Sequence, residues 1–159
     1  MTVNWSTGGT MDHPAYAGRI ETCARSSAWA TSSSSFNDIP DLAGGNITIM
    51  NSTSVIFINC HLSLETDGSG SLGHGVVRLV RSFNDGGWTN ITHFNVCGAL
   101  DNLVADGFQY RHDHNQSAGT TVKYKVQYRK GNTTGNHTVA DTGPGYATVA
   151  SLVYWEMQE

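Results

Sequence analysis

The chain has 159 residues, which is most simply one domain with a core large enough to fold unaided. Its net charge of −4 at pH 7 argues against nucleic-acid binding through a basic face. No stretch approaches the roughly eighteen consecutive apolar residues of a membrane-spanning helix, so we expect no membrane insertion. Glycine is frequent, at 18 residues, only 14% of residues are charged, and no long window has apolar residues at helical spacing. The composition therefore favours an all-β domain with many tight turns.

The first third of the chain is the least regular part. Residues 1–18 are polar and glycine-rich and are expected to form an extended arm, and a first strand is expected to begin near Gly18. A serine-rich loop follows at 31–35, and Asn37-Asp-Ile-Pro-Asp and Gly44-Gly45 are turn signals. We therefore place a boundary after residue 46, with the arm and first strand before it and a sandwich at 47–159.

The sandwich segment carries a series of strand patterns. Ser54–Glu65 alternates, and it is nearly apolar on both sides at its start, which is typical of a central strand. Asn84-Asp-Gly-Gly is a strong hairpin signal. Ala99–Asp106 fits either a short strand or one helical turn. Further strands are expected at 47–50, 76–83, 92–96, 108–114, 121–129 and 147–157.

The last forty residues are the most regular. Val122, Tyr124, Val126 and Tyr128 alternate with polar residues and should form one apolar face of a strand, with the lysines and arginine of Thr121–Arg129 as its solvated side. A second alternating run closes the chain. About eight strands separated by turns predict an antiparallel β-sandwich of jelly-roll type.

Three cysteines lie far apart in this chain, at Cys23, Cys60 and Cys97. An odd count does not suit a disulfide framework, and their spacing does not suit a zinc site. We interpret them as free thiols that act as small hydrophobic side chains, made in a reducing compartment.

The order of segments from Val55 onward resembles a known class of proteins. The resemblance is to the C-terminal domains of bacteriophage virion proteins. It is carried by a hydrophobic strand, then Val76-Val-Arg-Leu-Val-Arg with its glycine-rich hairpin, the alternating strand at 121–129 and the final Trp155-Glu-Met. The resemblance is especially to the domains of marine and cyanobacterial tailed phages, and such domains are tumour-necrosis-factor-like or related jelly rolls. The resemblance covers roughly residues 47–159.

The resemblance implies a structural role in a virion, as a capsid decoration (cement) protein or a short fibre or tail component made in the host cytoplasm. It implies a homotrimer that contacts phage coat or tail protein, with residues 1–46 as the attachment segment. We expect no enzymatic activity and no cofactor. Candidate interface residues are the aromatic side chains of the apolar strands: Phe57, Tyr124, Tyr128, Tyr154 and Trp155.

An alternative function is recognition of a host cell-surface glycan through loops. Aromatic side chains on rigid turns stack on sugar rings, and Trp88 follows a hairpin tip. The ligand-loop candidates are Trp88, Asn84, Asp85 and His74.

Metal binding and hydrolysis are further alternatives. His112 and His114 lie two residues apart, so both imidazoles would leave a strand on one face and could chelate an ion if a third ligand joined them. A hydrolase would need a nucleophile, a base and an orienting acid, and no Gly-x-Ser-x-Gly elbow occurs. We therefore interpret the two histidines as part of a polar strand face or loop edge.

Overall fold

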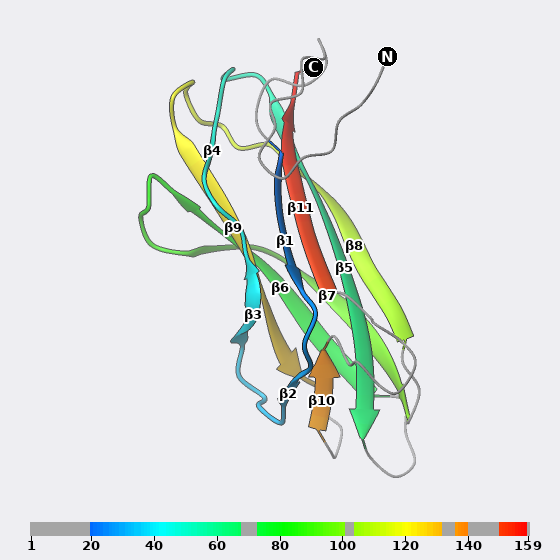
Figure 1. The fold of residues 1–159 in the computed structure, drawn as a ribbon. Helices are drawn as coiled ribbons and strands as arrows, with labels where there is room; N and C mark the ends of the chain where they lie inside the picture. The colour runs from blue at the N-terminus through cyan, green and yellow to red at the C-terminus, as the bar shows by residue number, and fades with distance from the viewer. Residues whose placement is uncertain (1–19, 68–72, 101–103, 132–135, 140–149, 159) are drawn as a thin grey trace, which may run out of the picture.

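The computed structural model describes residues 20–67, 73–100, 104–131, 136–139 and 150–158 (Figure 1). Eleven β-strands lie in these ranges, and the expected arm at 1–18 lies outside them. The strands are β1 (Glu21–Arg25), β2 (Trp29–Thr31), β3 (Asn37–Ala43), β4 (Ile47–Thr48), β5 (Val55–Asp67), β6 (Gly73–Phe83), β7 (Thr89–Leu100), β8 (Val104–His112), β9 (Thr121–Lys130), β10 (Asn136–Val139) and β11 (Ala150–Met157).

The strands form two antiparallel sheets that pack face to face (Figure 1). Sheet one has the order β1-β11-β5-β8, and sheet two has the order β3-β9-β6-β7. The short β4 pairs with β9, β10 joins β5 to β2, and a brief parallel pairing of β5 with β7 links the sheets. The chain passes back and forth between the sheets, which is the strand order of a jelly roll. The predicted fold class is confirmed.

Alternating side chains build the core between the sheets. Tyr124 and Tyr128 of β9 and Tyr154 of β11 are fully buried, and the rings of Tyr124 and Tyr154 meet edge to face, with 4.8 Å between centroids. Because successive side chains of a strand point to opposite faces, the period-two pattern placed these residues inward. The predicted apolar face of β9 and the central position of β5, between β11 and β8, are confirmed.

Two strands form where the sequence signals predicted turns. β3 contains Asn37-Asp-Ile-Pro-Asp, and it pairs with β9 at the end of sheet two, where a proline can be accommodated. Its register shifts between Asp38 and Ala43, and Asp41 between them has a positive φ of 65°. β10 begins within 131–138, a segment rich in glycine, asparagine and threonine whose composition is typical of a turn. Tertiary pairing has overridden the local turn preference in both places.

The first third of the described chain belongs to the same sandwich. β1 pairs along its whole length with β11, and β3 pairs with β9. Strands on both sides of residue 46 therefore pair within the described sheets, and the boundary expected after residue 46 stays a prediction. A role of the first residues in particle attachment stays a proposal.

Two of the cysteines lie where small hydrophobic side chains would. Cys60 is buried in the core, Cys23 is half-buried in the same row of sheet one with Leu152 of β11 between them, and both are free thiols. Burial raises the pKa of the Cys23 thiol to about 11, and it raises the pKa of Cys60 as well. Both groups are therefore protonated at neutral pH and poorly nucleophilic. The third cysteine, Cys97, lies in β7 at a position where the structure describes the backbone but not the side chain.

The described ranges contain no helix long and apolar enough to cross a bilayer.

Candidate functional site

The five aromatic residues expected at an interface separate into two groups. Tyr124, Tyr128 and Tyr154 are at most 1% exposed, so in the folded chain they fill the core instead of reaching the surface. Their hydroxyls find partners inside: Tyr124 bonds His112 Nδ1 at 2.6 Å, Tyr128 bonds His137 Nδ1, and Tyr154 donates to the Gly45 carbonyl. A buried tyrosine normally satisfies its hydroxyl in this way.

Phe57 and Trp155 lie on the outer face of sheet one. They are direct cross-strand partners on β5 and β11, and each is half-buried. Their rings are 6.1 Å apart between centroids and only 19° from parallel. Since β5 and β11 are the two inner strands of sheet one, this aromatic pair lies midway across the width of its outer face, near one end of both strands.

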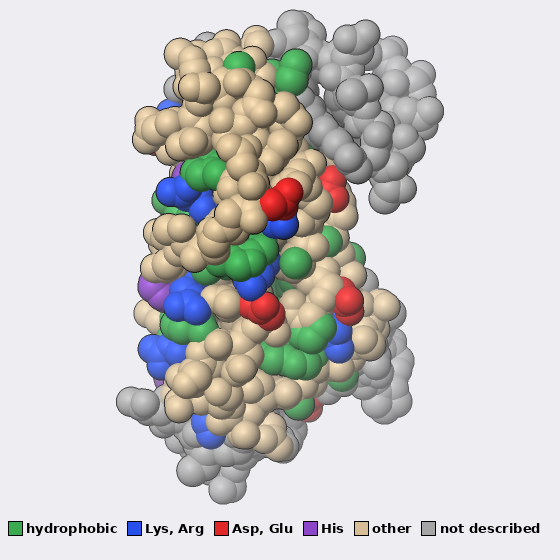
Figure 2. All heavy atoms as spheres, turned by 90° about the vertical axis from the view of Figure 1, so that its left-hand side faces the viewer, with side chains coloured by type: hydrophobic (Ala, Val, Ile, Leu, Met, Phe, Trp, Pro, Cys, Tyr) green, Lys and Arg blue, Asp and Glu red, His purple; other side chains and the backbone are tan. Residues whose placement is uncertain are grey.

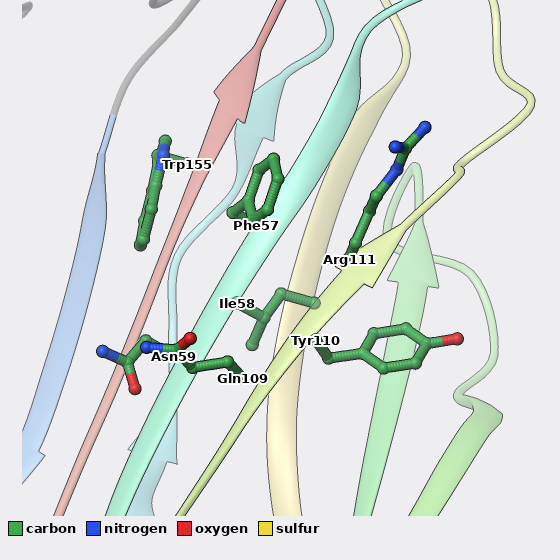
Figure 3. Close-up of a pocket in the computed structure, with 7 residues that line it drawn as sticks. All are labelled: Phe57, Ile58, Asn59, Gln109, Tyr110, Arg111 and Trp155. Carbon is green, nitrogen blue, oxygen red and sulfur yellow. The ribbon is translucent and has the colours of Figure 1, made fainter.

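A shallow groove of about 310 Å³ lies beside the aromatic pair (Figure 3). One wall is the row Trp155, Phe57 and Arg111, which are in register across β11, β5 and β8. The other wall is the next row, where Asn59 of β5 faces Gln109 of β8. We call this the outer groove; its lining residues are Phe57, Ile58, Asn59, Gln109, Tyr110, Arg111 and Trp155.

The outer groove combines an apolar wall with polar groups that have both donors and acceptors. Asn59, Gln109 and Arg111 are exposed, and Arg111 also bonds Asp113 through Nε at 3.1 Å. Aromatic rings next to an arginine are the composition that recurs at the centres of protein interfaces. The outer groove is thus a candidate contact surface rather than a catalytic cleft.

The ligand-loop candidates are brought together with one exception. Asn84 and Asp85 have φ values of 47° and 55° and form a tight turn between β6 and β7, which the Asn-Asp-Gly signal predicted. Trp88 follows this turn and is 40% exposed. His74 is exposed near the other end of β6. At the rise per residue of a β-strand it is about 30 Å from this turn, so it does not join the group.

The two histidines considered as metal ligands are buried. His112 is 6% exposed and His114 is 3% exposed, and each has neighbours of its own. Burial, with the nearby charges of Arg81 and His114, lowers the pKa of His112 to about 4, so its imidazole is neutral at physiological pH. Within the described part of the chain, no three His, Cys, Asp or Glu side chains are grouped closely enough to hold a metal ion.

A buried cluster that the sequence interpretation missed lies at the end of β11. Glu156 is fully buried, its carboxylate accepts the backbone N–H groups of Met50 and Asn51 at 3.0–3.1 Å, and it bonds the Ser54 hydroxyl. His114 Nε2 lies 3.1 Å from the same hydroxyl. The alternation of β11 could have revealed this, because Glu156 falls on the inward side with Leu152 and Tyr154.

This cluster brings together a serine, a histidine and an acid, but not as a catalytic triad. His114 Nδ1 accepts the N–H of Gln116 at 3.0 Å, which leaves the ring proton on Nε2. Nε2 therefore donates to Ser54 and cannot take its proton. Glu156 also bonds the serine rather than the histidine. The cluster fixes the loop between β4 and β5 against β11.

Comparisons with known proteins found similar three-dimensional structures but no similar sequences. No protein-family model matches the chain, and no curated protein sequence matches it. The fold is similar to chains in two structures of infectious bursal disease virus. The chain of the Gt strain has a TM-score of 0.49 and 14% sequence identity, and the match covers 100% of this chain and 42% of the viral one. The chain of the Gx strain has a TM-score of 0.49 and 14% identity, and the match covers 99% of this chain and 41% of the viral one. A mutant VP2 protein of that virus, in derived particles, has a TM-score of 0.48 and 14% identity, and the match covers 98% of this chain and 40% of the viral one.

This chain spans about two fifths of the length of those viral chains. At 14% identity and with TM-scores below 0.5, the likeness assigns no function to this protein.

Proposed function

We propose that this chain is a structural subunit of a virion, a capsid decoration protein or short tail component of a bacteriophage that assembles as a homotrimer. The outer groove with its aromatic pair forms the contact between copies. The observation that carries this proposal is the stacked pair of Phe57 and Trp155 on the two inner strands of sheet one, on its outer face. Jelly rolls are common in virus particles, where function resides in surfaces added to the sandwich.

The composition of this face supports a protein contact. The residues that flank Trp155 on the same side of β11, Val153 and Met157, are also half-buried and apolar, so the apolar strip continues along the strand. Arg111 and the amides of Asn59 and Gln109 border the strip on β5 and β8 and supply a polar rim. Burial of an aromatic pair inside such a rim is the usual arrangement of an energetic centre in an interface.

The test is the oligomeric state of purified protein and of a variant in the aromatic pair. Trp155→Ala should weaken self-association by about 30-fold or more, because a central interface tryptophan contributes about 2 kcal/mol or more. Sedimentation velocity or mass photometry over a micromolar concentration series gives the equilibrium. Wild-type protein should be mainly trimeric.

A matched variant keeps this test specific. Among the residues that the structure describes, none accepts a hydrogen bond from the Trp155 indole N–H, so Trp155→Phe retains an apolar ring and should preserve most of the association. Far-ultraviolet circular dichroism checks that both variants are folded. Wild-type protein that is monomeric throughout the concentration series would refute the proposal.

A second candidate function is recognition of a host surface glycan, and the exposure of Trp88 favours it. The ring lies next to a rigid turn, on a different sheet from the outer groove, so both functions fit one molecule. Purified protein should bind host cells, and Trp88→Ala should abolish that binding. Unchanged binding by Trp88→Ala would exclude this loop.

A further inference from the structure

The outer face of sheet two carries a concentration of positive charge in an acidic protein. Four of the nine lysine and arginine residues of the chain project from it: Lys123, Lys125 and Arg129 from β9, and Arg78 from β6. Figure 2 shows Lys and Arg side chains alternating with hydrophobic ones on this side of the molecule. We call these four residues, with Phe36 and Trp88, the cationic face.

Aromatic rings lie between the cations. Lys125 Nζ is 4.4 Å from the centroid of the Trp88 ring, and Lys123 Nζ is 5.6 Å from it. The guanidinium of Arg78 lies 4.0 Å above the Phe36 ring, with that of Arg129 at 5.3 Å. Cation–π attraction of this kind holds a ring in place over the strand.

The two lysines beside Trp88 have different roles. The side chain of Lys125 is only 12% exposed, because it is enclosed by Trp88 and by Asp38, to which it bonds at 2.8 Å. It therefore positions the ring. The side chain of Lys123 is 27% exposed and bonds Asp85 at 2.6 Å, so it can also offer its charge to a ligand.

We infer that the cationic face binds an acidic polysaccharide, with one sugar ring packed on Trp88 and carboxylate or sulfate groups beside Lys123, Arg78 and Arg129. This inference rests on the second candidate function and specifies its ligand class. From Lys123 to Arg129 the strand extends roughly 20 Å, which is long enough for several sugar units. The surrounding side chains include amides and carboxylates that can bond sugar hydroxyls.

Two carboxylates within the face favour a polysaccharide over a nucleic acid. The hydrogen bond from Lys123 lowers the pKa of Asp85. Burial raises the pKa of Asp38, but hydrogen bonds from Lys125 and Gln127 outweigh that effect and lower it overall. Both acids are therefore ionised at neutral pH. They can accept hydrogen bonds from sugar hydroxyls, which a polysaccharide carries on its rings and an internal deoxynucleotide lacks.

The experiment compares four ligands of similar length by isothermal titration calorimetry: a heparin oligosaccharide, an oligogalacturonate, a neutral cello-oligosaccharide and oligo-dT. At least one of the two acidic oligosaccharides should bind, with an affinity that falls as sodium chloride is raised, because salt screens exposed charges. Trp88→Ala should weaken binding about tenfold, and Lys123→Gln should reduce its salt dependence.

The control is His61→Gln, which changes an exposed side chain of β5 in the other sheet, outside the outer groove, and should leave binding unchanged. The oligomeric state, measured on the same samples, should not change in Trp88→Ala, which separates this site from the outer groove. Equal binding of the neutral oligosaccharide would overturn the acidic ligand class while leaving the second candidate function standing. Failure of both acidic oligosaccharides to bind, or tighter binding of oligo-dT, would overturn the acidic polysaccharide, whereas the second candidate function would still be decided by host-cell binding of Trp88→Ala.

Discussion

Two histidines in the interior each bond a buried tyrosine. His112 meets Tyr124 near one end of the sandwich, and His137 meets Tyr128 nearer the other. Each pair lets a polar ring lie in an apolar core without an unsatisfied hydroxyl, which would otherwise cost about 1–3 kcal/mol. Burial raises the pKa of both tyrosines, so they remain protonated donors.

The neutral state of His112 predicts that stability decreases in mild acid. Its pKa is about 4 in the folded protein and about 6.5 in the unfolded chain, so the unfolded state binds more protons between these values. The contribution of neutral His112 to the free energy of unfolding should therefore be fully present above pH 6.5. As the pH drops toward 4, the free energy of unfolding should fall by about 3 kcal/mol because of this group. Urea unfolding at pH 7 and pH 4.5 measures the change.

Variants of two histidines identify the group responsible. His112→Gln should be less stable at pH 7 but lose less stability between pH 7 and 4.5 than the wild type. The pKa of His114 is also lowered by burial, so part of the dependence should remain. His61→Gln replaces an exposed histidine and should keep the full dependence. An unchanged dependence in His112→Gln would contradict this assignment.

At the scale of elements, the last strand is fixed at its end by a buried carboxylate. Glu156 lies opposite Ile56 in β5, and its oxygens accept the N–H groups of Met50 and Asn51. These two amides belong to the loop between β4 and β5, so one side chain connects β11 to a segment more than a hundred residues away in sequence.

Glu156→Gln tests this connection. One amide oxygen cannot replace both carboxylate oxygens, and the new NH₂ group would face the loop donors, so we expect a loss of about 1–3 kcal/mol in the free energy of unfolding. Amide hydrogen exchange should be faster at Met50 and Asn51. Gln158→Ala alters a neighbouring exposed residue and should change neither measurement. Unaltered exchange in Glu156→Gln would show that the loop is held by other contacts.

At the scale of the whole molecule, the two ends of the described chain close one sheet. β11 lies between β1 and β5, so sheet one is continuous only when the final strand is in place (Figure 1). β11 also delivers Leu152 and Tyr154 to the core.

Removal of residues 150–159 should therefore prevent cooperative folding. The shortened chain would expose the core side of β5 and leave β1 without its pairing partner. We expect loss of the β-sheet circular dichroism signal and of a cooperative thermal transition. Removal of Gln158 and Glu159 alone should preserve both. A shortened chain that still unfolds cooperatively would mean that sheet two and the remaining strands suffice.

Sequence patterns were informative for strands with regular alternation and uninformative for others. The inward face of β9 follows from period two, because only one of its sides is apolar. β11 and the start of β5 carry apolar residues on both sides, so alternation pairs their side chains by face without choosing the inward one. β3 and β10 carry turn residues and became strands through pairing with β9 and β5, which local sequence does not encode. Local sequence was equally insufficient for predicting sites. Alternation shows that Tyr124 lies on the apolar side of its strand, but it does not show whether the core of the same chain or a partner chain buries that side.

The sequence by itself determined the all-β class, the jelly-roll expectation and the direction in which most strand side chains point, because these depend on alternation and turn chemistry within short segments. Only the tertiary structure decided that Tyr124 is core while Trp155 faces outward. It also decided that Ser54, His114 and Glu156 meet, and that Trp88 lies over Lys125. These contacts join strands far apart in sequence, and their geometry exists only after the two sheets have paired and packed.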